Sequence, residues 1–464
     1  MNKFNKYYFL GIGGIGMSAL ARYFNSKGFQ VAGYDRTETK LTADLQTEGI
    51  QICFNEALSY VPSEFMNPKS TQIVLTPAIP ENHPQLVYFR ENNFNILKRA
   101  QVLGNITRQS KGICIAGTHG KTTTSTITAH LLYQSKVNCN AFLGGIANNY
   151  NTNLLLSGES NLVVIEADEY DRSFHQLTPY MAVITSADPD HLDIYETKEA
   201  FRESFEHFAS LIKPGGALIV KKGIELHPEL QKGVKVYSYS MEDGGDFHAE
   251  NIKIKNGEIR FDFVTPTDRV ADVRLGVPAK INVENSVAAM ALAWLNGVTT
   301  EELRVGISSF SGIYRRFNVV YKSANIVYMD DYAHHPSELK ASISSIRALF
   351  PDKKITGIFQ PHLFTRTRDF AEGFSEALSG LDELLLMDIY PARELPIEGV
   401  TSEIILKNVT IGQKKLVSKA DLLDAVEQLK TDVLVTFGAG DIDQFVPKIK
   451  NLLKNKEQRI KNKD

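Results

Sequence analysis

The segment Gly117–Thr124, with the sequence GTHGKTTT, constrains the fold of this chain most, and it directly follows the apolar stretch 112–116. A strand that leads into a glycine turn and then a helix points backbone N–H groups, the helix dipole, a lysine and a hydroxyl at one place. Polyphosphate and Mg²⁺ fit there, so ATP is the first candidate ligand. The strict Walker spacing would need glycine where Ile115 stands, so this is the shorter GxxGK[ST] form. The alternative is an ordinary glycine turn with a surface lysine.

The length and composition indicate several globular domains that act on small molecules. A chain of 464 residues predicts two to four domains, about three. The net charge of −3 provides no basic surface for nucleic acid. No apolar run reaches about 18 residues, so we expect no membrane span. The three cysteines form no CxxC pair, and residues 1–20 lack a cleavage pattern, which together favour a cytoplasmic location.

The N-terminal residues predict a βαβ unit. We expect strands at 7–10 and 30–34 and a helix at 17–26, with the glycine turn 11–16 after the first strand. Gly11, Gly13 and Gly16 satisfy GxGxxG, and Asp35 follows the second strand, where a ribose-binding acid would lie. The same geometry serves any phosphate or diphosphate at a helix N-terminus. Both a dinucleotide and another diphosphate ligand therefore remain open.

Two further blocks of alternating strands and helices follow, the second beginning near Arg316. The fold class is therefore α/β, with three domains that each hold a mostly parallel, doubly wound sheet. The strands are expected at 112–116, 162–166, 181–185 and 217–220, and then at 326–330, 355–360, 383–388 and 433–438. The charged tail 450–464 is expected to be a frayed, solvated helix.

Acidic side chains follow two strands of the middle block. Glu166 ends the strand 162–166, where Mg²⁺ is usually held, while Asp168, Glu169 and Asp171 are expected on a solvated acidic face. His191 follows the strand 181–185, and imidazole is an unusual Mg²⁺ ligand, so taken alone it is a loop histidine.

In the third block, polar motifs are expected just past strands. DDYAHHP spans 330–336 and is expected to open a helix, and FQPHLFTRTR spans 359–368. Arg315 and Arg316 lie at the boundary between blocks; they are either a surface linker or reach phosphates when domains close.

The order of these motifs resembles the Mur ligases across essentially the whole chain. The matching motifs are GIGGIGMS (11–18), GTHGKTTT (117–124), EADE (166–169), DHLDIY (190–195), RRF (315–317), DDYAHHP (330–336), FQPH (359–362) and GAGDI (438–442). The resemblance implies a UDP-sugar domain over 1–107, a central ATPase domain over 108–313 and a C-terminal Rossmann-like ligase domain over 314–464.

The resemblance also implies an ATP-dependent ligation in peptidoglycan precursor synthesis. The lactyl carboxylate of UDP-N-acetylmuramate would attack the γ-phosphate of ATP, and the amine of L-alanine would then displace phosphate from the acyl phosphate. Such chemistry needs positioning and charge neutralisation more than a protein nucleophile. The cofactors implied are ATP and Mg²⁺, and we expect a monomer or homodimer.

By resemblance, site roles fall on the following residues. ATP would be bound by Gly117, Thr118, His119, Gly120, Lys121, Thr122, Thr123, Asn282, Asn285, Arg316 and Asp331; metal by Thr122, Glu166 and His191; the UDP-sugar by Gly13, Gly14, Ile15, Gly16, Asp35 and Arg366; and the amino acid by His334 and His335. The residues expected to take part in catalysis are Lys121, Glu166, His191 and His335.

Three positions depart from the family pattern, and three other functions compete. Family members often have asparagine at Ser186, histidine at Ile281 and arginine at Leu363, and we find no assured counterpart of the carbamylated lysine of sister ligases. The competing functions are a recycling ligase that adds a murein tripeptide to the sugar acid, an NAD-dependent oxidoreductase, and a regulatory or motor ATPase.

Overall fold

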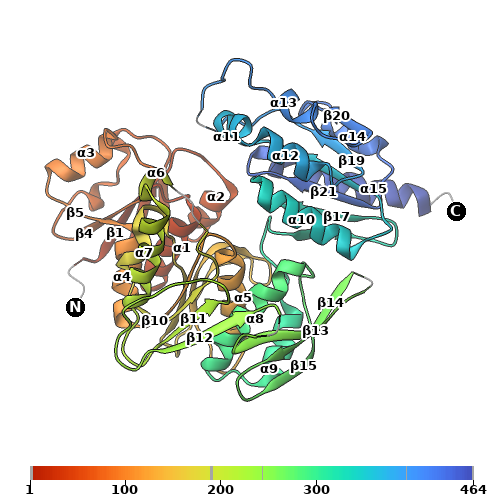
Figure 1. Cartoon of the computed structure of the whole chain (residues 1–464). Coiled ribbons are helices and arrows are strands. Elements are labelled where there is room, and N and C mark those ends of the chain that lie inside the picture. The colour runs from red at the N-terminus through yellow and green to blue at the C-terminus, as the bar shows by residue number, and fades with distance from the viewer. Residues whose placement is uncertain (1–3, 189–191, 243, 256, 393, 462–464) are drawn as a thin grey trace. The chain divides into compact units, whose positions relative to one another are not determined.

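The computed structural model describes residues 4–188, 192–242, 244–255, 257–392 and 394–461. This chain divides into two compact units, which are described separately. The first comprises residues 1–251, 261–273 and 283–310, and the second comprises residues 252–260, 274–282 and 311–464. The structure contains three sheets, which are mostly parallel, so the predicted α/β fold class is confirmed (Figure 1).

The N-terminal sheet is fully parallel, with strand order β3-β2-β1-β4-β5. The GxGxxG turn lies between β1 and α1, and the predicted βαβ unit is confirmed, with α1 beginning two residues earlier than expected. The elements are β1 (Lys6–Leu10), α1 (Ile15–Ser26), β2 (Gln30–Tyr34), α2 (Lys40–Thr47), β3 (Gln51–Cys53), β4 (Thr71–Leu75), α3 (Pro84–Glu91), β5 (Asn95–Lys98) and α4 (Arg99–Gln109).

The central sheet has ten strands in the order β15-β14-β13-β12-β11-β10-β6-β9-β7-β8. Its middle is parallel, and β8 pairs with β7 antiparallel at one edge. The elements are β6 (Lys111–Ala116), α5 (Lys121–Tyr133), β7 (Asn140–Ala147), β8 (Thr152–Leu155), β9 (Leu162–Glu166), β10 (Pro179–Ile184), α6 (Leu192–Tyr195), α7 (Lys198–Ser210), β11 (Ala217–Lys221), β12 (Lys235–Ser240), β13 (Phe247–Lys255), β14 (Glu258–Val264), β15 (Arg269–Arg274), α8 (Lys280–Leu295) and α9 (Thr300–Ser309).

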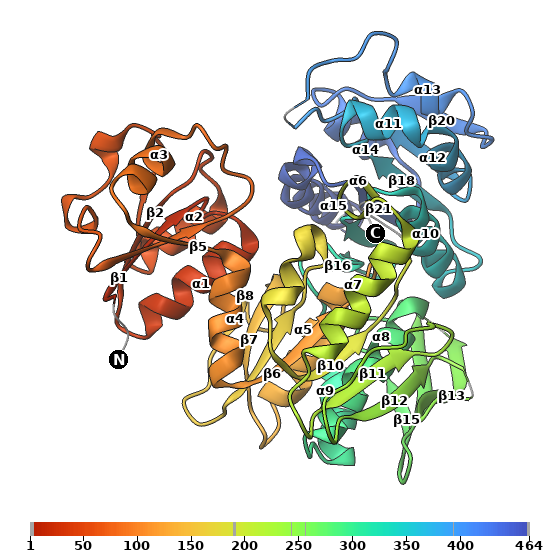
Figure 2. The ribbon, with the colours of Figure 1, turned by 60° about the vertical axis from the view of Figure 1, so that its left-hand side comes forward.

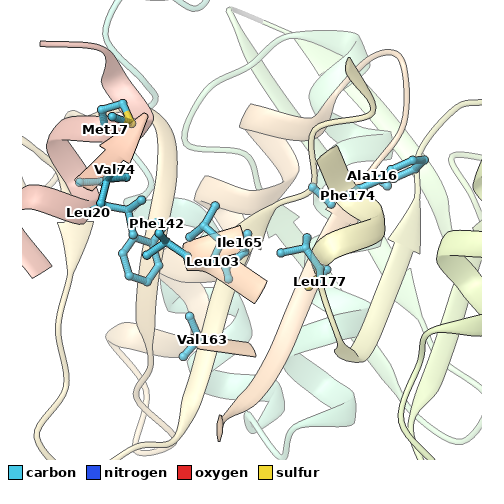
Figure 3. Packing of buried hydrophobic residues seen from close by; sticks show 14 of the residues in the cluster. Met17, Leu20, Val74, Leu103, Ala116, Phe142, Val163, Ile165, Phe174 and Leu177 are labelled. Carbon is cyan, nitrogen blue, oxygen red and sulfur yellow. The ribbon is translucent and has the colours of Figure 1, made fainter. Parts of the chain in front are cut away.

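A continuous apolar core joins α1 to the central sheet within the first unit. Met17 and Leu20 of α1 lie in the same buried cluster as Phe142 of β7 and Ile165 of β9 (Figure 3). Side chains of this size stabilise a fold by about 1.5–3 kcal/mol each when fully buried. The helix that follows the GxGxxG turn is therefore packed against the central sheet, at strands β7 and β8.

The C-terminal sheet has the order β16-β17-β21-β18-β19-β20, and β16 alone among its described pairings runs antiparallel to its neighbour. Because side chains alternate along a strand, Ile358 packs with α14 and α15 while Phe359 meets Phe374 of α12. The elements are β16 (Asn318–Lys322), β17 (Val327–Asp331), α10 (Pro336–Leu349), β18 (Ile355–Phe359), α11 (Phe364–Asp369), α12 (Ala371–Leu378), β19 (Glu383–Leu386), α13 (Glu403–Leu406), β20 (Gln413–Leu416), α14 (Leu422–Gln428), β21 (Val433–Phe437) and α15 (Val446–Lys461).

The tail 450–464 was predicted to be a frayed, solvated helix; the helix is confirmed as far as residue 461, but the prediction that it is solvated was wrong for one of its faces. Helix α15 continues to Lys461, and its residues Ile449 and Leu453 are buried in the core of the second unit. Glu457, one turn further on, is also buried and accepts a hydrogen bond from Tyr321 Oη at 2.5 Å. Sequence reasoning missed the buried face of this helix, on which Ile449, Leu453 and Glu457 recur every four residues, because lysines dominate the composition of the segment.

No helix among the described residues combines the length and apolar character needed to cross a membrane.

Candidate active site

The turn 117–120 requires glycine at both of its glycine positions. Gly117 has φ +136° and Gly120 has φ +82°, conformations that other residues rarely adopt. A Cβ on Gly117 would lie 2.1 Å from Thr185 Oγ1, and one on Gly120 would lie 2.8 Å from Asn285 Oδ1. The backbone of the turn therefore passes close to Thr185 and Asn285. Helix α5 begins at Lys121, immediately after the turn.

The end of strand β10 holds this turn in place. Thr185 Oγ1 donates to the His119 carbonyl at 2.5 Å, and Ser186 Oγ accepts the His119 N–H at 2.7 Å. Thr118 Oγ1 donates to the Asp188 carbonyl at 2.7 Å. Ser186 stands where the family often has asparagine, and its hydroxyl supplies a side-chain acceptor to the turn at that position.

Lys121 is anchored to its own turn and to a buried carboxylate. Its Nζ donates to the Gly117 carbonyl at 2.6 Å and to Glu169 Oε1 at 2.7 Å. The side chain of Glu169 is only 3% exposed, and Tyr195 Oη holds its backbone carbonyl at 2.5 Å. The third contact of the ammonium group, to the Thr118 carbonyl, is long at 3.5 Å, so a phosphate oxygen could replace it.

The prediction of a solvated acidic face was therefore wrong for Glu169, whereas the side chains of Asp168 and Asp171 are 39% and 46% exposed, as expected of a solvated face. Glu169 pairs with Lys121, Asp168 pairs with Arg99 at 2.8 Å, and Asp171 pairs with Lys98 at 3.1 Å. The sequence alone shows these acids as a cluster without cations, because their cationic partners lie 48 to 73 residues away along the chain.

Glu166 lies beside the start of the glycine turn 117–120. Strands β6 and β9 are parallel and place Glu166 opposite Ile115, so its side chain leaves the sheet at the edge where the turn begins. A Cβ on Gly144 of β7 would come within 1.9 Å of Glu166 Oε2. The carboxylate thus occupies space that only a glycine leaves open.

Thr122 and Glu166 provide oxygen donors of the kind that Mg²⁺ prefers. Thr122 is the second residue of α5 and is buried. Mg²⁺ takes one or two protein ligands and completes its shell with phosphate and water, so two oxygen donors fit it. The described residues contain no group of three or more His, Cys, Asp or Glu side chains that could hold a metal by itself. His191, the third expected ligand, lies outside the described residues.

The asparagines of α8 occupy different surroundings. Asn285 lies at the turn, where its Oδ1 accepts from Thr124 Oγ1 at 3.3 Å and approaches Gly120. Asn282 Nδ2 donates to the Val277 carbonyl at 3.2 Å. Within the first unit the structure therefore brings Asn285 to the turn.

The glycine turn 11–16 is closed by Asp35. The Gly13 N–H donates to Asp35 Oδ2 at 2.7 Å, and the Thr37 N–H donates to Asp35 Oδ1 at 3.1 Å. Asp35 thus holds the conformation of the turn itself. The first turn of α1, whose N-cap Gly14 provides no side-chain cap, presents free amide groups beyond it.

A pocket of ≈ 320 Å³ opens at this end of α1. It combines the glycine turn with the basic residues at the junction of β5 and α4 and with the segment after β9; the lining residues include Gly14, Ile15, Gly16, Thr76, Lys98, Arg99, Asp168, Tyr170 and Ser173. The helix N-terminus favours an anion, while Lys98 and Arg99 are paired with Asp171 and Asp168. Sequence reasoning missed Lys98 and Arg99, which no motif marks.

In the second unit, Arg315 is a buried structural residue, so the linker interpretation was wrong for it. It is 9% exposed with φ +64°, donates to the Gly438 carbonyl at 2.5 Å and lies 3.6 Å from both Asp330 and Asp443. Arg316 is exposed, with its guanidinium 5.4 Å from the centre of the Tyr332 ring.

DDYAHHP begins inside a strand, which corrects the expectation that it lies past one. Asp330 and Asp331 are the last two residues of β17, and α10 starts at Pro336. Asp330 is fully buried, and burial raises its pKa to about 6 against the opposing effect of Arg315. Burial also raises the pKa of Asp331, whose Oδ2 accepts from Ser342 Oγ at 2.6 Å.

The two histidines lie at the start of α10. His335 is the N-cap of the helix, and Glu338, a residue that the motif did not include, accepts the His334 N–H at 3.0 Å. Burial lowers the pKa of His334, which favours the neutral imidazole. Arg366 lies in α11, and Leu363 just before that helix has φ +72°.

Comparison with known proteins gives matches along the whole chain. Residues 6–111 match the domain described as "Mur ligase family, catalytic domain", residues 115–293 the "Mur ligase middle domain", and residues 315–440 the "Mur ligase, glutamate ligase domain". The UDP-N-acetylmuramate–L-alanine ligase of Phocaeicola vulgatus is 58% identical, with coverage of 98% of this chain and 100% of the relative. That of Porphyromonas gingivalis W83 is 56% identical over 96% and 98%.

Two solved structures of similar fold each cover 97% of this chain. The UDP-N-acetylmuramate–alanine ligase of Thermotoga maritima superposes with a TM-score of 0.81 at 26% identity, covering 97% of this chain and 99% of that one. The murein peptide ligase of Psychrobacter arcticus has a TM-score of 0.65 at 21% identity over 97% and 99%, a likeness of fold.

Proposed function

Because the chain belongs to the Mur ligase family, we propose that it joins L-alanine to the lactyl carboxylate of UDP-N-acetylmuramate, with conversion of ATP to ADP and phosphate. The observation that carries the proposal is the presence, in one compact unit, of two helices, α5 and α1, that each begin directly after a glycine turn with no side-chain cap. One suits the triphosphate of ATP and the other the diphosphate of a sugar nucleotide. Relatives at 55–58% identity carry the name of this activity.

The reaction proceeds in two steps that the site residues support by charge and position. A lactyl carboxylate oxygen attacks the γ-phosphorus, the bond to the β-phosphate oxygen breaks, and ADP leaves. Lys121 and the amides of the turn 117–122 neutralise the charge on the phosphates, which is the main requirement of phosphoryl transfer. The alanine nitrogen then attacks the acyl carbon, and phosphate leaves as the amide forms.

The amine must lose a proton before or during this second step. In our proposal, His334 and His335 bind the amino acid, and Asp331 and Arg316 bind ATP. The lowered pKa of His334 keeps the imidazole neutral near pH 7, as a proton acceptor must be.

Mg²⁺ would be held by Thr122 and Glu166, with His191 as a further ligand. When bound, the ion neutralises charge on the β- and γ-phosphates. Thr122 and Glu166 themselves supply two oxygen donors from separate elements, α5 and β9, at the same edge of the central sheet.

The sugar nucleotide would bind at the glycine turn 11–16, with Gly13, Gly14, Ile15 and Gly16 at its diphosphate and Arg366 at the muramyl group. Lys98 and Arg99 line the same pocket, each paired with a carboxylate, and their remaining N–H donors could bind a phosphate oxygen. Asp35 already accepts the Gly13 N–H, so it shapes this turn. We propose that the enzyme acts in the cytoplasm, because a reducing compartment keeps its three cysteines as free thiols.

Release of phosphate tests the proposal. The full chain with ATP and Mg²⁺ should be nearly silent until both UDP-N-acetylmuramate and L-alanine are added. The panel should include glycine, L-serine and the murein tripeptide, and a second assay should follow NADH absorbance. Turnover only with the tripeptide would support the recycling ligase, and hydrolysis without any amino acid would support a regulatory ATPase. A change at 340 nm would support the oxidoreductase.

A further inference from the structure

Asn153 of β8 is a fully buried amide at the boundary between the central sheet and α1. It is 0% exposed, and β8 is the edge strand of that sheet beside α1 (Figure 2). A buried amide is costly unless its donors and acceptor are bonded, so its partners show what it holds.

All the partners of the Asn153 side chain lie on α1. Its Nδ2 donates to the Ile15 carbonyl at 2.6 Å and to Ser18 Oγ at 2.9 Å, and its Oδ1 accepts from Arg22 Nη1 at 2.5 Å. Residues 15, 18 and 22 are spaced by three and four, so they lie on one face of the helix. A single side chain of the central sheet thus binds the first two turns of α1.

The neighbours of this contact are fixed in turn. Ser18 Oγ donates to the Ile15 carbonyl at 2.9 Å, and Arg22 forms a two-pronged pair with the Glu48 carboxylate, with Nε and Nη2 at 2.9 and 2.7 Å from its oxygens. Such forked pairs restrict orientation as well as position. The network runs without interruption from Glu48 through Arg22 and Asn153 to the first turn of α1.

That first turn is the anion-binding end of the helix. Ile15 and Gly16 line the pocket at the glycine turn, and Ile15 is the residue whose carbonyl Asn153 binds. A carbonyl and an N–H of the same helical turn move together, because the backbone of a helix is rigid on this scale. The position of Asn153 therefore fixes where the amides of α1 point.

We propose that Asn153 is a positioning residue for the sugar-nucleotide site, acting through α1 without touching the substrate. The proposal rests on the function proposed above and deepens it, since it assigns part of the affinity for a nucleoside diphosphate sugar to a residue of the ATPase domain. It predicts that loss of the amide weakens binding of UDP-N-acetylmuramate and spares the ATP site.

The test compares Asn153→Ala with Asn140→Ala in the full chain. Asn140 of the adjacent strand β7 is a buried amide as well, 7% exposed, and its Nδ2 donates to the Ser160 carbonyl at 3.0 Å, away from α1. Both variants lose a buried amide, so both lower the melting temperature. Only Asn153→Ala should raise the KM for UDP-N-acetylmuramate, by about tenfold, with kcat and the KM for ATP within about twofold of wild type.

Calorimetric titration with UDP-N-acetylmuramate separates the possible failures. Wild type that binds the ligand while Asn153→Ala binds it equally well would overturn the role of Asn153. Wild type that binds no UDP-sugar would instead overturn the proposed function. Ser18→Ala, which removes one acceptor and leaves the helix intact, serves if Asn153→Ala does not fold; an unchanged KM for the sugar nucleotide in that variant would also overturn the proposal.

Discussion

In our proposal, the phosphate chemistry depends most on Lys121. Its Nζ is already directed by the Gly117 carbonyl and Glu169, so little side-chain freedom remains to be lost when a phosphate binds. We expect Lys121→Ala to keep the fold and to lower kcat by about 10²-fold or more, since a fixed positive charge is removed from the transferring group. Steady-state phosphate release measures this.

Lys213 provides a matched control. Its Nζ donates to the carbonyls of Thr107 and Ser110, both at 2.8 Å, in the same unit. Lys213→Ala should lower the melting temperature and leave kcat within about twofold, because no phosphate is expected there. Near-normal turnover by a folded Lys121→Ala variant would show that the ATP chemistry does not take place at the turn 117–122.

Gly144 controls the position of Glu166. In Gly144→Ala the new methyl group would overlap Glu166 Oε2 and displace the carboxylate. The Mg²⁺ concentration that gives half-maximal activity should rise by about tenfold, as it should in Glu166→Ala, because one oxygen ligand is misplaced. Titration of activity with Mg²⁺ at saturating substrates checks this.

Gly158→Ala is the control for that substitution, because a Cβ there meets nothing within 4 Å. Its Mg²⁺ dependence should match that of wild type. If Gly144→Ala also matches wild type, Glu166 is not a metal ligand.

Among the elements, α5 and α9 are tied together by a buried histidine. His130 of α5 bonds Tyr150 Oη at 2.8 Å, and its Nε2 lies 3.1 Å from the Gly306 carbonyl of α9. Burial lowers the pKa of His130 to about 4, against the opposing effect of the Gly306 carbonyl. The folded state therefore favours the neutral ring.

This pKa predicts a pH dependence of stability with a definite sign. The contribution of neutral His130 is fully present above the unfolded pKa of 6.5 and is lost as the pH falls through about 4. The loss amounts to at most about 3 kcal/mol of unfolding free energy. His130→Gln should flatten this part of the profile between pH 6.5 and 4, as followed by thermal melting.

The exposed His227 serves as the control for the pH profile. His227→Gln should keep the wild-type dependence. A His130→Gln profile parallel to that of wild type would show that the imidazole does not titrate in this window.

The sequence predicted the elements that carry strong local patterns. The strand predicted at 162–166 is β9, because LVVIE is an apolar, largely β-branched run that ends in a charge, and the strand predicted at 30–34 is β2, which completes the βαβ unit after the GxGxxG turn. The strands β12 to β15 were not predicted, since their faces alternate polar and apolar residues without a motif beside them. The burial of one face of α15 was not predicted either, because lysines dominate its composition.

The candidate site was predictable where a motif fixes the backbone and not where a partner comes from far along the chain. Gly117, Gly120 and Lys121 follow from local geometry, and the structure shows the close approaches that require the two glycines. The pairing of Glu169 with Lys121 depends on a contact across 48 residues, which no local pattern contains. The role assigned to His191 stays a prediction, since that residue lies outside the described part of the chain.

On the scale of the whole molecule, the first unit places the turn 117–120 and the glycine turn 11–16, for which we propose a triphosphate and a diphosphate ligand, on one continuous core. The core residues Leu20 of α1 and Ile165 of β9 belong to one buried cluster, so the two turns are parts of one packed body. Within the family, this arrangement accounts for a ligase that activates a carboxylate of one nucleotide-linked substrate with the γ-phosphate of another.

The central claim, activation of the lactyl carboxylate by phosphorylation, is tested most directly by oxygen transfer. UDP-N-acetylmuramate labelled with ¹⁸O in its lactyl carboxylate is incubated with the full chain, ATP, Mg²⁺ and L-alanine, and the products are weighed by mass spectrometry. The account predicts that one labelled oxygen passes to inorganic phosphate for each amide formed, because the bond broken in the second step lies between the acyl carbon and that oxygen. Phosphate free of label, or label found in AMP, would contradict it.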